Sequence, residues 1–124
     1  MSESNSSPSW YWNKGLHDAE ITHIDEIVLP YDYTQKNPIR NCLIIFLNSK
    51  NALFDTSVKE IRLYNYKLIS PDNKSFCADS WWIADRLTEE NGKYILTVSL
   101  QNAGSLIKKF NLTVRFEKAD VIRN

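Results

Sequence analysis

The sequence predicts an all-β protein, built as a single antiparallel β-sandwich or strongly curved sheet of about six strands with little helix. Two observations predict this class. Apolar and polar residues alternate over several segments, which is the period of a half-buried strand. Asn91-Gly92 lies between two such segments, and both residues tolerate the positive φ of a two-residue hairpin turn. No long window keeps the apolar spacing of a capped amphipathic helix.

The composition indicates one globular domain. At 124 residues the chain fits a single domain, which we place at residues 10–124, after a polar, serine-rich and disordered leader at residues 1–9. The 15 basic and 15 acidic side chains cancel. Because nucleic-acid binders usually carry a basic excess, no nucleic-acid partner is expected.

Cellular location follows from what the chain lacks. It shows no secretion signal and no apolar run long enough to cross a bilayer, which predicts a cytoplasmic protein without a membrane partner.

Cys42 and Cys77 both stand beside apolar residues. We therefore expect two reduced, buried thiols rather than a disulfide, and two lone cysteines lack the spacing of a zinc site. The sequence predicts no cofactor, and it sets no oligomeric state.

The first half of the chain contains three predicted strands. In residues 17–29 the apolar positions change face, so either a bulge is expected near His23 or both faces are covered, and Pro30 ends the strand. Residues 40–47 are apolar on both faces from Leu43 onward and predict a central strand between two layers. Residues 58–69 are rich in β-branched and aromatic residues and stop at the turn-forming run that begins with Ser70 and Pro71.

The predicted hairpin at residues 81–101 has a definite register. If Asn91-Gly92 is the loop, Leu87 faces Leu96 and Asp85 faces Val98. This pairing puts Trp82 and Arg86 side by side on the polar face, and Asp85 on the apolar face. The sixth strand, residues 106–117, alternates with Leu106, Phe110, Leu112, Val114 and Phe116 pointing inward.

Two features of this hairpin are candidates for binding. Trp and Arg are enriched at binding hot spots, so Trp82 with Arg86 would suit the anchor of a partner surface. The alternative is that a second layer, a loop or the aromatic segment at residues 10–12 folds over Trp82. An isolated carboxylate is costly on an apolar face, so Asp85 is either a functional group or a structural carboxylate, bonded to a backbone N–H or placed at the rim of the sheet.

His17-Asp18, with His23 and Asp25 nearby, suggests metal or hydrolytic chemistry. Along a strand, however, His17 and His23 would be about 20 Å apart, too far to share one metal ion. No metal site is predicted, and His17 and Asp18 remain candidate binding residues. No Gly-x-Ser-x-Gly motif occurs and no cysteine neighbours a histidine, so no catalytic residue is assigned.

The string Leu16-His17-Asp18-Ala19-Glu20-Ile21, just after an aromatic stretch, resembles the opening of small, mostly uncharacterised bacterial proteins. Their later parts are also similar, with a tryptophan-containing strand, a turn, Tyr94-x-Leu96-x-Val98 and a closing strand. The likeness covers residues 10–117 loosely. Some relatives of this type look like immunity proteins, which neutralise polymorphic toxins by binding them. The resemblance implies a binding protein rather than an enzyme.

The sequence therefore favours a protein-binding domain whose partner is another protein, and a toxin-neutralising immunity protein is its specific form. The alternative is a module that binds a small ligand or carbohydrate through Trp81, Trp82 or the aromatics at residues 10–12. A small acid–base enzyme comes third, and would need Asp85 and His17 within hydrogen-bonding reach. The predicted binding residues are Trp82, Arg86, His17, Asp18 and Asp85.

Overall fold

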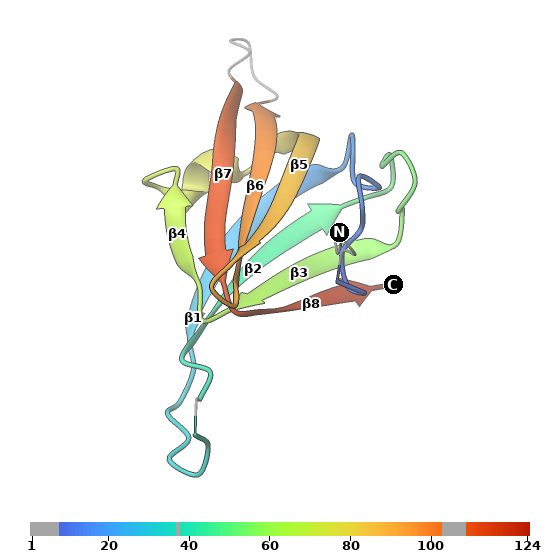
Figure 1. The fold of residues 1–124 in the computed structure, drawn as a ribbon. Helices are drawn as coiled ribbons and strands as arrows, with labels where there is room; N and C mark the ends of the chain where they lie inside the picture. Colours follow the sequence, from blue (N-terminus) through green and yellow to red (C-terminus); the bar gives the residue numbers. More distant parts are fainter. Residues whose placement is uncertain (1–7, 37, 103–108) are drawn as a thin grey trace.

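The computed structural model describes residues 8–36, 38–102 and 109–124, and shows eight β-strands in one antiparallel sheet (Figure 1). The prediction of an all-β, antiparallel protein with little helix is confirmed. Of the expected leader at residues 1–9, all but Pro8 and Ser9 lie outside the described residues. The elements are β1 (Glu20–Val28), β2 (Asn41–Asn48), β3 (Val58–Tyr64), β4 (Lys67–Ser70), the 3₁₀ turn η1 (Lys74–Cys77), β5 (Ser80–Glu90), β6 (Lys93–Asn102), β7 (Lys109–Phe116) and β8 (Lys118–Arg123).

The expected number of about six strands is wrong, because two predicted strands continue past a bend. Asn65, at a φ of 51°, ends β3, and the chain then forms β4 beside β7. In the same way, the chain leaves β7 at Glu117 and forms β8 beside β3. Neither bend carries a glycine or proline that would mark it in the sequence. Leu106, expected at the start of the sixth strand, lies outside the described residues.

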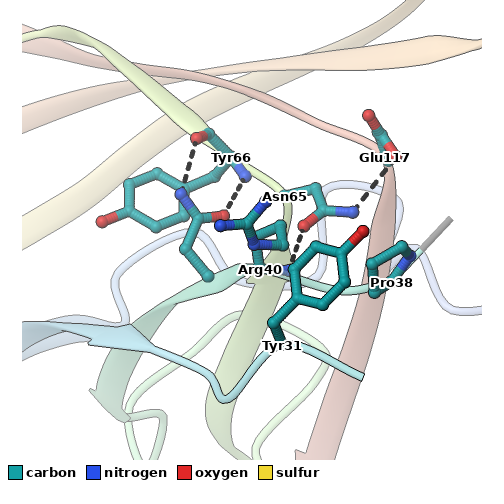
Figure 2. A pocket seen from close by; sticks show the side chains of 7 residues that line it. Tyr31, Pro38, Arg40, Asn65, Tyr66 and Glu117 are labelled. Atoms are coloured by element: carbon teal, nitrogen blue, oxygen red, sulfur yellow. Dashed lines mark hydrogen bonds between the residues drawn. The ribbon is translucent and has the colours of Figure 1, made fainter. Parts of the chain in front are cut away.

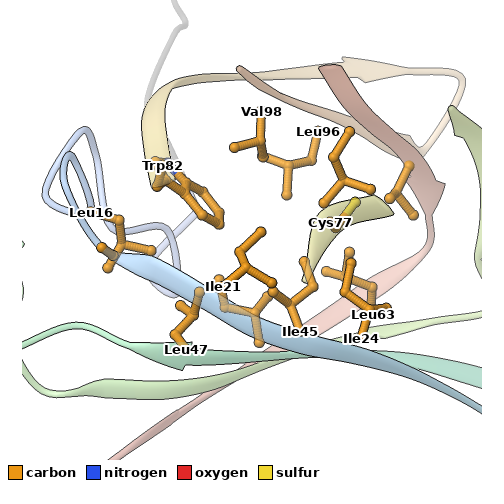
Figure 3. Close-up of a cluster of buried hydrophobic side chains, with 14 of the residues drawn as sticks. Leu16, Ile21, Ile24, Ile45, Leu47, Leu63, Cys77, Trp82, Leu96 and Val98 are labelled. Carbon is orange, nitrogen blue, oxygen red and sulfur yellow. The ribbon is translucent and has the colours of Figure 1, made fainter. Parts of the chain in front are cut away.

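The sheet is open, with the order β4-β7-β6-β5-β1-β2-β3-β8, and it folds on itself (Figure 1). One half consists of β1, β2, β3 and β8, and the other of β5, β6, β7 and β4. The halves are joined in the middle by only two residue pairs, Glu20 with Trp81 and Ile21 with Ser80. Side chains from both halves meet in one core, as Figure 3 shows for Ile21, Ile45, Leu63, Trp82, Leu96 and Val98.

The predicted registers hold in the two best-marked pairings. In the hairpin Leu87 faces Leu96 and Asp85 faces Val98. The pairing of β1 with β2 shifts between Ile21 and His23, which confirms the expected bulge. Across the described ranges, no helix is long and apolar enough to span a membrane.

β2 is buried on both faces, as expected of a central strand, but only one of the two expected layers is present among the described residues. Leu43 and Ile45 point into the core, whereas Cys42 and Ile44 lie on the other face. The described residues form a single sheet, so no second sheet covers that face. Cys42 and Ile44 are nonetheless buried, opposite Tyr64 and Arg62 of β3, whose long side chains stand beside them.

Replacing Gly92 by alanine should lower the free energy of unfolding by about 1 kcal/mol. Gly92 has a φ of 77°, and an added Cβ would meet nothing within 4 Å, so the cost is that of the backbone conformation alone. Urea unfolding measures it, with the neighbouring exposed Lys93→Ala as control. A loss no larger than that of the control would contradict the turn geometry.

Candidate functional site

A bulge in β5 determines where Trp82 points. The pairing with β6 shifts between Trp82, which faces Leu100, and Ala84, which faces Ser99, so that Ile83 is the extra residue. Trp82 is fully buried and Arg86 is exposed. The expectation that the two lie side by side on the polar face is therefore wrong, because the extra residue reverses the alternation before it. Trp82 offers no surface to a partner.

Backbone groups of the segment before β1 bind the bulge on the side away from β6. Asp18 N donates to Trp82 O at 2.8 Å, and Trp82 N donates to Ala19 O at 2.8 Å. His17 Nδ1 lies 2.5 Å from Ile83 O, a carbonyl that can only accept, so this ring nitrogen is the donor. His17 Nε2 lies 3.5 Å from Asp18 Oδ1. The His17 ring and the Asp18 backbone, both from predicted binding residues, thus hold β5 in its bulged form. The side chains of His17 and Asp18 stay partly exposed.

Asp85 is bonded by three aromatic side chains. Its carboxylate accepts from Trp12 Nε1 and Trp82 Nε1, each at 2.8 Å, and from the hydroxyl of Tyr11. Trp12 also packs edge-to-face on Trp82 with the ring centroids 5.5 Å apart. The segment at residues 10–12 therefore covers Trp82, as the alternative expectation had it. The same three donors satisfy a carboxylate that would otherwise be costly on an apolar face.

Asp85 and His17, the pair that acid–base chemistry would need, are not hydrogen-bonded to each other. Asp85 is bonded to the aromatic donors, and the His17 ring is bonded to the backbone of Ile83. No hydrogen bond connects Asp85 with His17 among the residues the structure places. In residues 8–36, 38–102 and 109–124, no three His, Cys, Asp or Glu side chains gather as they would around a metal ion.

A second region lies where the chain crosses from one half of the sheet to the other. It crosses at Asn65 and Tyr66, between β3 and β4, and again at Glu117, between β7 and β8; we call these three residues the corner. Glu117 N donates to Tyr64 O at 3.0 Å, and Asn65 Nδ2 donates to Glu117 Oε1 at 3.3 Å. The two crossings are therefore bonded to each other.

The connection between β1 and β2, described at residues 29–36 and 38–40, starts beside the corner; we call it the tyrosine loop. Its base is closed by Leu29 N donating to Arg40 O, and Arg40 N donates to the side-chain oxygen of Asn65 at 2.7 Å. Within the loop the rings of Tyr31 and Tyr33 are 4.5 Å apart, and the Arg40 guanidinium lies 4.6 Å from the centre of the Tyr31 ring. The Tyr31 ring therefore contacts both Tyr33 and Arg40.

A hollow of about 620 Å³ that is open to solvent lies between the tyrosine loop and the corner (Figure 2). Most of its polar groups already have partners. Asn41 accepts from Tyr66 N at 3.0 Å and its amide nitrogen lies 3.4 Å from Tyr66 O, while both groups of the Asn65 amide are used as described above. The lining residues are Tyr31, Pro38, Arg40, Asn41, Asn65, Tyr66 and Glu117.

Apolar side chains are exposed at both ends of β2. At its start, Tyr33 is 89% exposed and Val28, the last residue of β1, is 87% exposed. At its end, Leu53 and Phe54 are exposed in the loop between β2 and β3, where Leu53 N donates to His17 O at 2.8 Å. His17 and Asp18 are therefore next to one exposed patch, and the tyrosine loop forms the other.

Sequence patterns alone do not single out the tyrosine loop. Its two tyrosines, Tyr31 and Tyr33, stand in a segment between strands that has no periodicity. The available signal was the residue type, because tyrosines in a connecting segment are more often used for binding than for packing.

Comparison of the chain with family models, with curated proteins and with solved structures gives no significant match. The function is therefore argued from geometry.

Trp82→Ala should lower the free energy of unfolding by roughly 3–5 kcal/mol, because it empties a fully buried aromatic site and leaves Asp85 with one donor fewer. Trp81→Ala, at the adjacent and half-exposed position, should cost clearly less. Chemical denaturation of the two variants measures the difference. Equal losses would mean that the bulge does not turn Trp82 inward.

Tyr11→Phe should flatten the alkaline loss of stability. Burial, then the hydrogen bond to Asp85, then the charge of Asp85 raise the pKa of Tyr11 above its usual value. Folding thus favours the neutral phenol. Its contribution to stability is fully present below the ordinary tyrosine pKa of about 10 and is lost as the pH rises from there through the pKa of the folded state.

We expect the free energy of unfolding to fall more steeply above about pH 10 for the unaltered protein than for Tyr11→Phe. Urea unfolding at a series of pH values measures both slopes. Tyr33→Phe, which removes an exposed hydroxyl, is the control and should follow the unaltered protein. Parallel curves for all three would show that Tyr11 is not held against Asp85.

Proposed function

We propose that this chain is a protein-binding domain and that the tyrosine loop is its contact surface. The observation that carries the proposal is a group of exposed side chains, Val28 at the end of β1 with Tyr31 and Tyr33 in the tyrosine loop, whose base is closed by the backbone bond from Leu29 to Arg40. Tyrosine supplies much contact area at a low cost in conformational entropy, and it is enriched among binding hot spots. A zero net charge also suits a protein partner better than a nucleic acid.

A protein partner fits this loop better than a small ligand does. Sites for small molecules are concave and mostly apolar, whereas here the apolar side chains project from a protruding connection (Figure 1) and the hollow beside it is largely polar. The carbohydrate alternative relied on stacking on Trp81, which is half-buried, on Trp82 or on the aromatics at residues 10–12. Trp82 and Trp12 are buried, which removes two of those faces from contact with a sugar.

The specific form we propose is an immunity protein that neutralises a toxin by binding it. It is supported by the resemblance of residues 16–21 to the opening of small bacterial proteins, some of whose relatives look like immunity proteins. In this form the partner is a toxic protein encoded beside this chain. Co-expression tests it directly: this chain should restore growth to cells that produce the neighbouring gene product. The Tyr33→Ala variant should restore it less well. If the neighbouring product is harmless, the immunity role is wrong while protein binding is unaffected.

The binding surface is located by photo-crosslinking in cells of the source organism. A photoreactive phenylalanine analogue replaces Tyr33 in one variant and Phe54 in another. Phe54 is the matched control, because it is also an exposed aromatic but lies at the opposite end of β2. We expect a protein to be captured from position 33 and not from position 54. Capture from position 54 alone would assign the contact to the other patch.

Purified partner then gives the affinity. Tyr33→Ala should weaken binding by about 2 kcal/mol or more, which is roughly 30-fold, if Tyr33 is a hot spot. The same variant should unfold at the temperature of the unaltered protein, because a side chain that is 89% exposed contributes little packing. Phe54→Ala should leave the affinity unchanged. An unchanged affinity for Tyr33→Ala would show that the tyrosine loop is not the contact.

A further inference from the structure

The carboxylates around the hollow have partners of their own. Glu117 accepts from Asn65 Nδ2 and lies 3.7 Å from Lys93 Nζ. Glu26 accepts from the Tyr66 hydroxyl and lies 3.5 Å from Lys74 Nζ. Asp32 accepts from both the backbone and the hydroxyl of Thr34, at 2.9 and 2.6 Å. Their negative charges are therefore already stabilised from within the chain.

Arg40 lacks such a partner. In the part of the chain that the structure describes, its guanidinium forms no ion pair, although it lines the hollow and is exposed. It rests on the face of Tyr31 (Figure 2). Its N–H donors make no hydrogen bond to the described residues, so they stay free for a planar acceptor. An Arg fixed by stacking also loses less conformational freedom when it is bound.

We infer that the hollow receives an aspartate or glutamate side chain of the protein partner, whose carboxylate pairs with the Arg40 guanidinium beside Tyr31. This inference rests on the proposed function and adds the chemistry of the partner. A carboxylate matches the fork of N–H donors with two parallel hydrogen bonds. The hollow is open to solvent and has room for a side chain of this size. The other polar groups of the corner are bonded to each other, so the guanidinium is what remains to attract an incoming group.

Selection from a library of random peptides displayed on phage tests the inference without a known partner. Peptides retained by the unaltered protein and lost with Tyr33→Ala report on the tyrosine loop. We expect these peptides to share an acidic residue. Synthetic copies should bind Arg40→Gln about tenfold or more weakly than the unaltered protein, because a charge-assisted hydrogen-bonded pair is lost. Changing the acidic residue of the peptide to its amide should have the same effect.

Lys118→Gln is the matched control. Lys118 is also an exposed cation over a tyrosine ring, 5.9 Å from the centre of Tyr64, but it lies in β8 and does not line the hollow. This variant should bind the peptides as the unaltered protein does. Arg40→Lys should bind with intermediate affinity, because the charge remains and the fork is lost. Thermal unfolding of Arg40→Gln should match the unaltered protein, since only an exposed side chain is changed.

The peptide selection distinguishes failure of the acidic-side-chain proposal from failure of the tyrosine loop as a protein-binding surface. Peptides that depend on Tyr33 but carry no acidic residue, or that bind Arg40→Gln normally, would overturn the acidic side chain and leave protein binding in place. Equal losses for Arg40→Gln and Lys118→Gln would show a general effect of positive charge, which also overturns it. A selection that returns no peptide dependent on Tyr33 would count against the tyrosine loop itself, and so against both proposals.

Discussion

The structure depends on one constraint, which is that a single sheet must bury its own apolar face. The described residues contain no second sheet and almost no helix, so the two halves of the sheet pack on each other. Two long strands must then bend sharply to reach from one half to the other. The bends occur together at Asn65, Tyr66 and Glu117, and the bonds between them close the far side of the core. The hollow lies beside these bends, lined by Asn65, Tyr66 and Glu117.

At the other side of the core, Asp85 holds the segment that covers the apolar side chains. A lone carboxylate directed inward would oppose folding, but three donors from Tyr11, Trp12 and Trp82 turn it into a point of attachment for the segment before β1. That segment covers apolar surface which the sheet leaves uncovered. The two sides of the core are therefore covered in different ways. At the corner the chain itself passes over the core, whereas at the other side the Asp85 carboxylate binds the aromatic side chains that cover it. Such a buried polar network fixes one arrangement of the rings.

Local patterns in the sequence predicted what depends on local residues. The Asn91-Gly92 turn determined the register of the hairpin, and the change of apolar face in β1 predicted its bulge. The bulge at Ile83 was not predictable, because the His17 ring and the backbone of Asp18 and Ala19 stabilise it from another part of the chain. For the same reason Trp82 was assigned to the wrong face. The bends at Asn65 and Glu117 depend on contacts with each other, and the site beside them combines residues from four separate segments.

The gathering of aromatic rings before β1 has a spectroscopic consequence. Trp10, Trp12 and Trp82 form a chain of neighbouring indoles, with ring centroids 6.1 and 5.5 Å apart in tilted and edge-to-face contacts. Transitions of rings that are held at fixed angles couple and give circular dichroism in the near ultraviolet, a signal that vanishes when tertiary packing loosens. Here this near-ultraviolet signal depends on the packing of residues 10–12 against the core. The far-ultraviolet signal reports the strands, so the two wavelength ranges distinguish detachment of this segment from unfolding of the sheet.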